Sequence, residues 1–173
     1  MPDDQIIRDL PLIKRRADRD SDADWDFRAY LKGSLNLSNP ELDVVVREIT
    51  DDVWSQIDCT TCANCCKTLQ IVIDDKDMRR LARKFGITTR AFAERHVSVD
   101  ADGTKHFTTT PCPLLGDDNK CTVYDDRPRA CRDFPYLNEA GFRHRTISAI
   151  GNTAICPIVF NVWDRLKKRY RGR

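Results

Sequence analysis

Four of the chain's eight cysteines fall within eight consecutive positions, and this cluster constrains the fold more than any other feature. Residues 59–66 read CTTCANCC, which is the spacing C-x2-C-x2-C-C. Two-residue spacing lets neighbouring thiolates converge on one metal ion, because the backbone turns between them and both sulfurs point inward. The alternative is that these cysteines are buried as small hydrophobic residues, but the Thr, Ala and Asn residues between them supply little core. The cluster therefore predicts metal or iron–sulfur ligation.

The segment before the cluster predicts that these thiols stay reduced. Residues 1–26 carry acids and bases throughout, and their longest apolar run is Ile6-Ile7, whereas a secretory signal needs a continuous apolar segment. We therefore expect a cytoplasmic protein, in which thiols bind metals more often than they form disulfides. A disulfide framework is the alternative if the chain is exported by another route.

The composition argues against two classes of partner. No stretch approaches the ~20 uncharged apolar residues that a membrane-spanning helix needs, so no membrane partner is expected. The 29 Lys and Arg against 27 Asp and Glu leave a net charge of +2, too near balance to indicate nucleic-acid binding. The basic run LKKRYRGR at the end of the chain is interpreted as the solvated end of a helix, where cations complement the helix dipole. The sequence specifies no protein partner and no small substrate.

The length of 173 residues fits one domain, with or without a tail. The predicted organisation is a polar N-terminal arm over 1–38, a cysteine-cluster metal-binding domain over 39–170 and a basic tail over 171–173. Residues 1–24 are expected to be loosely packed, because they are too polar to bury a core. The predicted fold class is α+β: a small single domain in which helices flank a cysteine-rich, irregular metal-binding centre and short hairpins.

Hydrophobic periodicity and capping signals place the elements of this domain. A helix is expected to begin with Asn39 as its N-cap and Pro40 in its first turn, and to carry an apolar face as far as Ile57. The other expected elements are a strand at 69–73, a helix at 74–85 with Phe85 inward and Gly86 as its stop, a helix at 88–96 capped by Thr88, a hairpin centred on Asp102-Gly103, a tight loop within 112–124, a strand at 142–150 and a final helix from Pro157.

The spacing of the first three cysteines favours an iron–sulfur cluster over zinc. Cys59, Cys62 and Cys65 match the first three ligands of the bacterial ferredoxin run, C-x2-C-x2-C-x3-C-P, although its fourth position is Leu69 here. A remote fourth ligand is plausible, because two later cysteines are each followed by proline, as the run requires. Cys66 is awkward for a single ion, since adjacent residues rarely aim both sulfurs at one centre, and suits a second metal or a cluster corner.

Zinc stays open as the alternative. Four thiolates would hold it in a closed tetrahedron at ~2.3 Å, and eight cysteines could close two such sites. Zinc knuckles usually use separated C-x2-4-C pairs, however, and Cys112, Cys121 and Cys131 are spaced nine and ten residues apart. Scattered ligands of this kind suit an iron–sulfur cluster, whose corners lie further apart.

A second block joins the cysteines to a longer pattern. Residues 112–136 read CPLLGDDNKCTVYDDRPRACRDFPY, which is C-x8-C-x2-Y-x2-R-P-x2-C-R-x-F-P. Together with CTTCANCC, this pattern resembles the CxxCxxCC cysteine-cluster family, the YkgJ-like zinc- or iron-chelating proteins, over about residues 59–157. The positions that match are Cys59, Cys62, Cys65, Cys66, Cys112, Cys121 and Cys131, the late Cys156-Pro157, and Tyr124, Arg127, Pro128, Arg132, Phe134 and Pro135.

The resemblance implies a metal site and no settled reaction. The cluster is also similar to one in bacterial flagellin lysine methylases, where it would serve methyl transfer. The 7 glycines of this chain are scattered, and none forms the glycine-rich strand–turn–helix that binds S-adenosylmethionine, which argues against a self-contained methyltransferase. The leading hypothesis is a metal-binding module that holds an iron–sulfur cluster or zinc. The alternative is an iron–sulfur-dependent redox or group-transfer enzyme, which would keep one metal position open for substrate.

Basic residues surround the last cysteine of the block. Arg132, next to Cys131, is predicted to contact the cofactor and to offset thiolate charge, since four thiolates on one divalent ion leave −2. Arg127 and Arg129 could do the same, or could form solvated ion pairs with neighbouring aspartates. The three histidines stand apart and are not assigned to the metal. The predicted metal ligands are Cys59, Cys62, Cys65, Cys66, Cys112, Cys121, Cys131 and Cys156.

Overall fold

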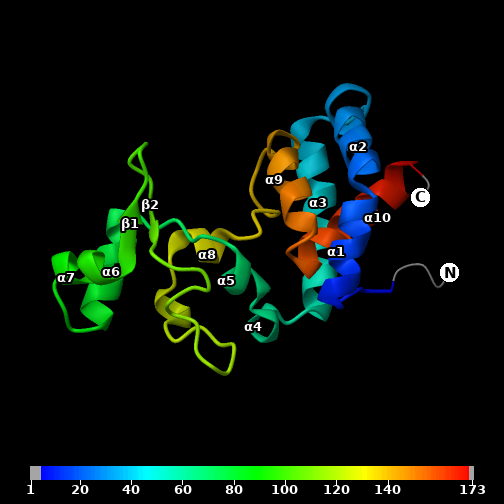
Figure 1. The fold of residues 1–173 in the computed structure, drawn as a ribbon. Helices are drawn as coiled ribbons and strands as arrows, with labels where there is room; N and C mark the ends of the chain where they lie inside the picture. The colour runs from blue at the N-terminus through cyan, green and yellow to red at the C-terminus, as the bar shows by residue number, and fades with distance from the viewer. Residues whose placement is uncertain (1–4, 172–173) are drawn as a thin grey trace. The chain divides into compact units, whose positions relative to one another are not determined.

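The computed structural model describes residues 5–171, and their elements divide into two units (Figure 1). One unit, called here the helical unit, joins residues up to 58 with residues from 135 onward, and the other, the cysteine unit, spans 59–134. The chain is mostly helical and carries one antiparallel hairpin, which confirms the α+β class. None of the helices within residues 5–171 is both long and apolar enough to cross a membrane. Of the expected basic tail, only Arg171 lies within the described residues.

The helical unit is built around the final helix, α10 (Pro157–Arg171), which packs against α1, α3 and α9. Pro157 begins this helix as predicted, and Trp163 is among its buried residues. The Trp163 ring meets Phe27 edge-on, with ring centroids 5.2 Å apart. The other elements of the unit are α1 (Leu10–Arg19), α2 (Ser21–Gly33), α3 (Asn39–Gln56), the short 3-10 helix η2 (Phe142–Arg145) and α9 (Thr146–Thr153).

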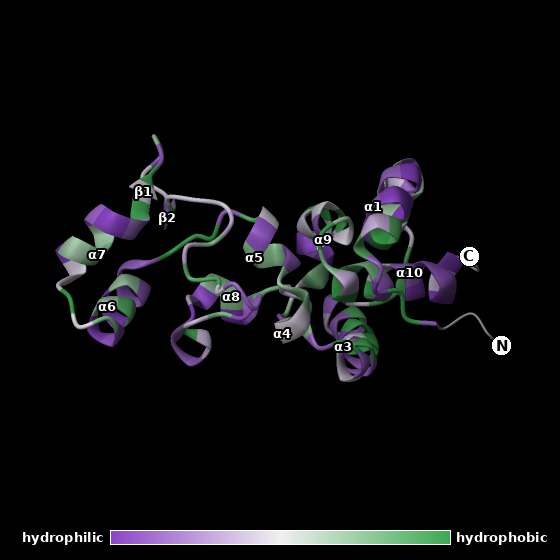
Figure 2. Cartoon of the chain, turned by 60° about the horizontal axis from the view of Figure 1, so that its bottom comes forward, coloured by the Kyte–Doolittle hydropathy of each residue, from purple (hydrophilic) through white to green (hydrophobic). Residues whose placement is uncertain are grey.

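Helix α3 is confirmed with a one-residue shift of its cap. Ser38, not Asn39, is the N-cap, and its side chain and that of Glu41 form a reciprocal capping box. Asn39 is the first helical residue, because Ser38 already satisfies the exposed N–H groups. The helix carries both hydrophobic and hydrophilic residues (Figure 2), and it buries Leu42, Val46 and Val53.

The expectation that residues 1–24 are loosely packed is wrong for residues 10–24, because residues 10–33 form α1 and α2. Asp9 caps α1 by accepting a hydrogen bond from the backbone N–H of Leu12, at 2.6 Å. The few apolar residues here recur at helical spacing: Ile13 is buried with Ala17, and Phe27 with Leu31. The low average hydrophobicity of the segment conceals this narrow apolar face, which is enough to pack two helices.

The strand expected at 142–150 is also wrong, because this segment forms η2 and α9. The Asp43 carboxylate accepts hydrogen bonds from the backbone N–H groups of Gly141 and Phe142, at 2.7 and 2.8 Å, and fixes the start of the helical segment. Gly141 has a positive φ of 79°, which glycine adopts without a steric penalty. The buried residues Thr146, Ala149 and Thr153 then follow a helical period.

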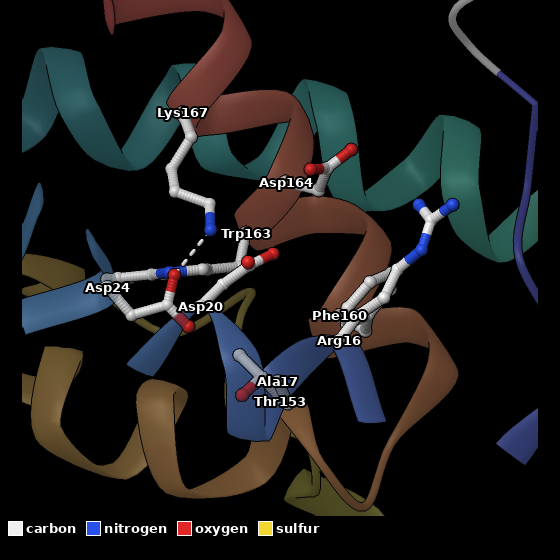
Figure 3. A pocket seen from close by; sticks show the side chains of 9 residues that line it. All are labelled: Arg16, Ala17, Asp20, Asp24, Thr153, Phe160, Trp163, Asp164 and Lys167. Atoms are coloured by element: carbon white, nitrogen blue, oxygen red, sulfur yellow. Dashed lines mark hydrogen bonds and ion pairs between the residues drawn. The ribbon is translucent and has the colours of Figure 1, made fainter. Parts of the chain in front are cut away.

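A small polar pocket lies within the helical unit (Figure 3). Its space accommodates about one water molecule. The Lys167 ammonium forms an ion pair with the Asp24 carboxylate, which is only 3% exposed. The Trp163 indole Nε1 also lines this pocket, and it has no hydrogen-bond partner among the described residues. The charge of Lys167 thus compensates the negative charge of the Asp24 carboxylate, which is almost completely removed from solvent.

We expect Lys167→Met to lower the free energy of unfolding of the helical unit by about 3 kcal/mol, because it leaves the Asp24 carboxylate buried and unpaired. The matched control is Lys14→Met, which breaks the exposed Lys14–Asp18 pair and should cost less than about 1 kcal/mol. Urea unfolding followed by tryptophan fluorescence measures both. Equal losses in the two variants would contradict the burial argument.

The cysteine unit contains short elements around a small apolar core. These elements are α4 (Cys59–Cys62), α5 (Asn64–Thr68), α6 (Asp75–Lys84), α7 (Thr89–His96), β1 (Val97–Val99), β2 (Lys105–Phe107), the 3-10 helix η1 (Tyr124–Asp126) and α8 (Arg129–Asp133). The predicted hairpin is confirmed, with β1 antiparallel to β2 and Gly103 at a φ of 86° in the turn. The buried core is formed by Ile71, Ile73, Met78, Leu81, Ala82, Phe92, Phe107, Leu114 and Val123.

Two predictions for this unit need correction. The strand at 69–73 is reduced to one bridge between Val72 and His106, although the backbone of Ile71 and Ile73 still bonds to β2. Phe85 is exposed although its ring stacks on the buried Phe92, with centroids 6.2 Å apart, and α6 ends one residue before it. The other predicted helix boundaries hold: Gly86, at a φ of 65°, follows the end of α6, and Thr88 caps α7.

Candidate metal centre

The CTTCANCC segment forms two short helices separated by a single residue. Cys59 and Cys62 are the first and last residues of α4, and Cys65 and Cys66 lie in α5. Between them, Ala63 is buried and has a positive φ of 52°, a conformation that costs an L-residue about 1–2 kcal/mol. The reversal at Ala63 ends α4 and redirects the chain, so the two pairs of thiols start from differently oriented helices.

The second block returns to the first through the backbone. The N–H of Cys112 donates to the carbonyl oxygen of Cys66, at 2.8 Å. The chain then folds back on itself, and a bridge pairs Leu115 with Cys121. Gly116 lets this loop close tightly, since a Cβ there would lie 3.3 Å from the carbonyl oxygen of Lys120 and 2.9 Å from the Asp118 side chain, which would have to move. The loop thus brings Cys121 back toward Cys112 and the end of α5.

The third segment places Cys131 in the short helix α8. Its N–H donates to the carbonyl oxygen of Pro128, at 3.0 Å, so the Arg-Pro turn sets the start of this helix. Cys112, Cys121 and Cys131 are all half-buried and pack against the apolar core of the unit. Three cysteines that are far apart in sequence therefore pack against the same core.

The electrostatics of the thiols link four of them. Burial and, to a smaller extent, the neighbouring Cys112, Cys66 and Cys121 together raise the pKa of Cys131 to about 12. Burial also raises the pKa of Cys112 to about 11, with added contributions from Cys66 and Cys121. The pKa of Cys121 is raised by burial and by Cys66. Because these charge effects need proximity, Cys66, Cys112, Cys121 and Cys131 form one cluster, called here the four-thiol group.

Cys66 has the most acidic thiol of the group. A hydrogen bond with the Cys65 side chain lowers the pKa of Cys66 to about 7, with the two sulfurs 4.0 Å apart. At neutral pH Cys66 is therefore the member of the group that most readily forms a thiolate, the form that binds metals.

Four predicted ligands are not members of this group, and of these Cys65 lies beside Cys66 in α5. Cys59 is exposed and Cys62 half-buried in α4, and Cys156 is buried in the helical unit directly before α10. Within residues 5–171, no three His, Cys, Asp or Glu side chains are arranged closely enough to hold one metal ion. The four thiols of the group are thus near one another, but they are not arranged to coordinate a single ion.

Arg127 is the arginine that acts on the thiols. Its charge lowers the pKa values of Cys121 and Cys131 and so offsets part of the increase that burial causes. Its guanidinium lies over the Tyr124 ring, 4.0 Å from the centroid. Arg132 donates to the Arg127 carbonyl oxygen, at 2.9 Å, and Arg129 pairs with Asp133, at 3.0 Å. The predicted contact between Arg132 and the cofactor stays a prediction.

The sequence analysis missed two residues of α6, Asp77 and Arg80, which contact the segment before Cys131. Asp77 is buried beside Met78 on the inward face of the helix. A charged residue at such a position was the signal, because buried carboxylates are rare unless they are paired.

Comparison with protein families matches residues 58–153 to the CxxCxxCC model, described as a "putative zinc- or iron-chelating domain". The match spans more than half of the 173 residues. The chain belongs to the CxxCxxCC family. All members of the four-thiol group lie inside the match, which ends before Cys156. The family description supports metal binding by these cysteines. Comparison with curated proteins and with solved structures found no match.

Proposed function

We propose that this CxxCxxCC protein is a metal-binding module, and that the four-thiol group holds an iron–sulfur cluster or zinc. The observation that carries the proposal is that Cys112, Cys121 and Cys131 pack on one core, that the backbone N–H of Cys112 bonds to Cys66, and that Cys66 raises the pKa of the other three thiols. The donor chemistry fits, because soft thiolates suit both zinc and iron–sulfur clusters. The wide spacing of Cys112, Cys121 and Cys131 in the sequence favours the iron–sulfur cluster, whose corners lie further apart, and a reducing cytoplasm would keep the thiols available.

The remaining cysteines have a subordinate place in the proposal. Cys59, Cys62 and Cys65 follow the ferredoxin-like spacing on consecutive short helices, and they would supply a second set of ligands. Cys156 lies in the helical unit, and we leave it outside the four-thiol group although a proline follows it. Arg127 and Arg132 would offset the negative charge that several thiolates leave on the bound metal.

Binding would require the thiols to lose protons and to draw together. Metal affinity and folding of such sites are coupled, since the ligands must be deprotonated and brought to one point. The low pKa of Cys66 makes it the natural first ligand, and the more protonated thiols of the group would follow.

Metal affinity should rise steeply with pH. At pH 8 Cys66 is mostly ionised, whereas Cys112, Cys121 and Cys131 are protonated, so binding to all four thiolates displaces about three protons. Below pH 6 Cys66 is protonated too, and about four protons are displaced. The logarithm of the association constant should therefore increase by about three per pH unit near pH 8 and by about four below pH 6. Chelator competition between pH 5 and 9 measures this slope, and an affinity independent of pH would contradict ligation by these thiols.

The test of the proposal is the metal content and visible spectrum of protein purified without oxygen. A brown protein with iron and inorganic sulfide supports the iron–sulfur cluster. A colourless protein with stoichiometric zinc would overturn that preference but not the metal module. A protein that holds and takes up neither metal would overturn the proposal as a whole.

A further inference from the structure

A buried carboxylate of α6 caps the helix that carries Cys131. Asp77 is 2% exposed, and its two carboxylate oxygens accept the backbone N–H of Arg129 at 3.2 and 3.1 Å. Arg129 is the first residue of α8, whose own N-cap residue, Pro128, makes no side-chain capping bond. Asp77 therefore supplies from a different helix the cap that the sequence of α8 does not provide.

Arg80 holds the turn that precedes the same helix. Its guanidinium donates to the carbonyl oxygens of Asp126 and Arg127, at 3.2 and 2.8 Å, and pairs with Asp77 at 2.6 Å. The Arg127 carbonyl also accepts a hydrogen bond from the Arg132 side chain. A planar guanidinium can join three acceptors at fixed angles, so this one side chain ties the turn to α6.

The segment that Asp77 and Arg80 hold is hydrogen-bonded to the backbone of Cys131, less than one helical turn away. Asp77 and Arg80 fix residues 126–129, and the Pro128 carbonyl in that segment accepts the N–H groups of Cys131 and Arg132, at 3.0 and 3.1 Å. Helix α8 is only five residues long, so it has little stability of its own. Its position relative to the apolar core therefore depends on α6.

We propose that Asp77 and Arg80 are positioning residues for the metal site: they hold α8 so that the Cys131 thiol faces Cys66, Cys112 and Cys121, without contacting the metal themselves. This inference rests on the proposed metal-binding function. Groups that orient metal ligands typically change metal affinity 10- to 100-fold when they are removed. The contacts of Asp77 and Arg80 with residues 126–129 are called here the clamp. We expect a loss of metal affinity within that range when the clamp is broken.

The test compares Arg80→Gln with Arg79→Gln in the full chain. Arg79 is the exposed neighbour on the same helix, so its replacement removes the same charge without touching the turn. Chelator competition with zinc should show about 10- to 100-fold weaker binding for Arg80→Gln and less than about twofold for Arg79→Gln. Asp77→Asn should weaken binding in the same direction, and it provides the measurement if Arg80→Gln does not fold. Unchanged affinity in the folded clamp variants would overturn the inference.

A second arm separates positioning from general destabilisation. If the clamp acts through Cys131, Arg80→Gln should have no further effect on zinc affinity in a Cys131→Ser background, but should keep its full effect in a Cys112→Ser background. An equal loss in both backgrounds would mean that Arg80 only stabilises the unit, and would overturn the inference.

A third arm needs no metal. In metal-free protein, Arg80→Gln should speed alkylation of Cys131 by iodoacetamide at least about threefold relative to that of Cys62, because α8 loosens and Cys131 is half-buried. An unchanged ratio of the two alkylation rates would overturn the proposal that Asp77 and Arg80 hold α8 in place. A wild-type protein that takes up no zinc or iron, together with a changed ratio, would refute the metal function while keeping the clamp.

Discussion

Replacing Cys131 by serine should weaken metal binding by more than about 100-fold, and the same change at Cys66, Cys112 or Cys121 should do likewise. A neutral hydroxyl is a poor substitute for a soft thiolate, and even groups that merely orient metal ligands cost up to about 100-fold. Cys66 raises the pKa of the other three thiols, and under the proposed function each change would remove a ligand of the same site. Elemental analysis of the anaerobically purified variants, followed by chelator competition, measures the loss.

The comparison variant for this series is Cys156→Ala. Cys156 is buried in the helical unit and lies beyond the family match, so a site made by the four-thiol group should keep its metal in this variant. Loss of metal from Cys156→Ala would make Cys156 a remote ligand of the same centre. Full metal content in both Cys131→Ser and Cys112→Ser would contradict the joint site.

Removing the metal should loosen residues 59–134 and leave the helical unit folded. The cysteine unit has a small apolar core and long irregular segments, so a metal held as proposed would contribute a large share of its stability. With free metal at about 1,000 times the dissociation constant, binding adds about 4 kcal/mol, which corresponds to a fall in melting temperature of roughly 15 °C or more on chelation.

The chain carries a built-in control for this experiment. All three tryptophans, Trp25, Trp54 and Trp163, belong to the helical unit, so their fluorescence reports that unit alone. Chelation should leave the tryptophan emission unchanged while limited proteolysis begins to cut within 59–134. An unchanged melting curve and cleavage pattern would mean that the cysteines do not stabilise this unit through a metal.

The elements with a clear apolar period could be predicted from the sequence. The helices at α3, α6 and α10 follow from residues such as Leu42, Leu81 and Leu166, which recur at helical spacing and are fully buried. The hairpin follows from Asp102-Gly103, since glycine supplies the positive φ of the turn. Local signals were sufficient wherever local chemistry decides the conformation.

The errors arose where distant contacts decide the conformation. Phe142 begins a helical segment because Asp43, about a hundred residues earlier, accepts its N–H. Residues 10–33 are helical because Ile13 and Phe27 find a buried surface that the polar composition does not reveal. In each case the segment itself was visible in the sequence, but the distant residues that it contacts in the fold were not.

The candidate site was predictable in kind but not in arrangement. The eight cysteines and the family pattern were sufficient to indicate metal binding. The association of Cys66 with Cys112 depends on a backbone hydrogen bond between distant segments, which no spacing rule contains. The roles of Asp77 and Arg80 depend on how α6 packs against residues 126–129, and only the folded chain shows that contact.

The most direct test of the central claim is a map of thiol protection in the metal-loaded protein. Brief alkylation under anaerobic conditions, with and without prior chelation, is followed by mass spectrometry of each cysteine peptide. The account predicts that Cys66, Cys112, Cys121 and Cys131 are protected together in the loaded protein and become reactive together when the metal is removed. Four thiols that react at the same rates before and after chelation would contradict it.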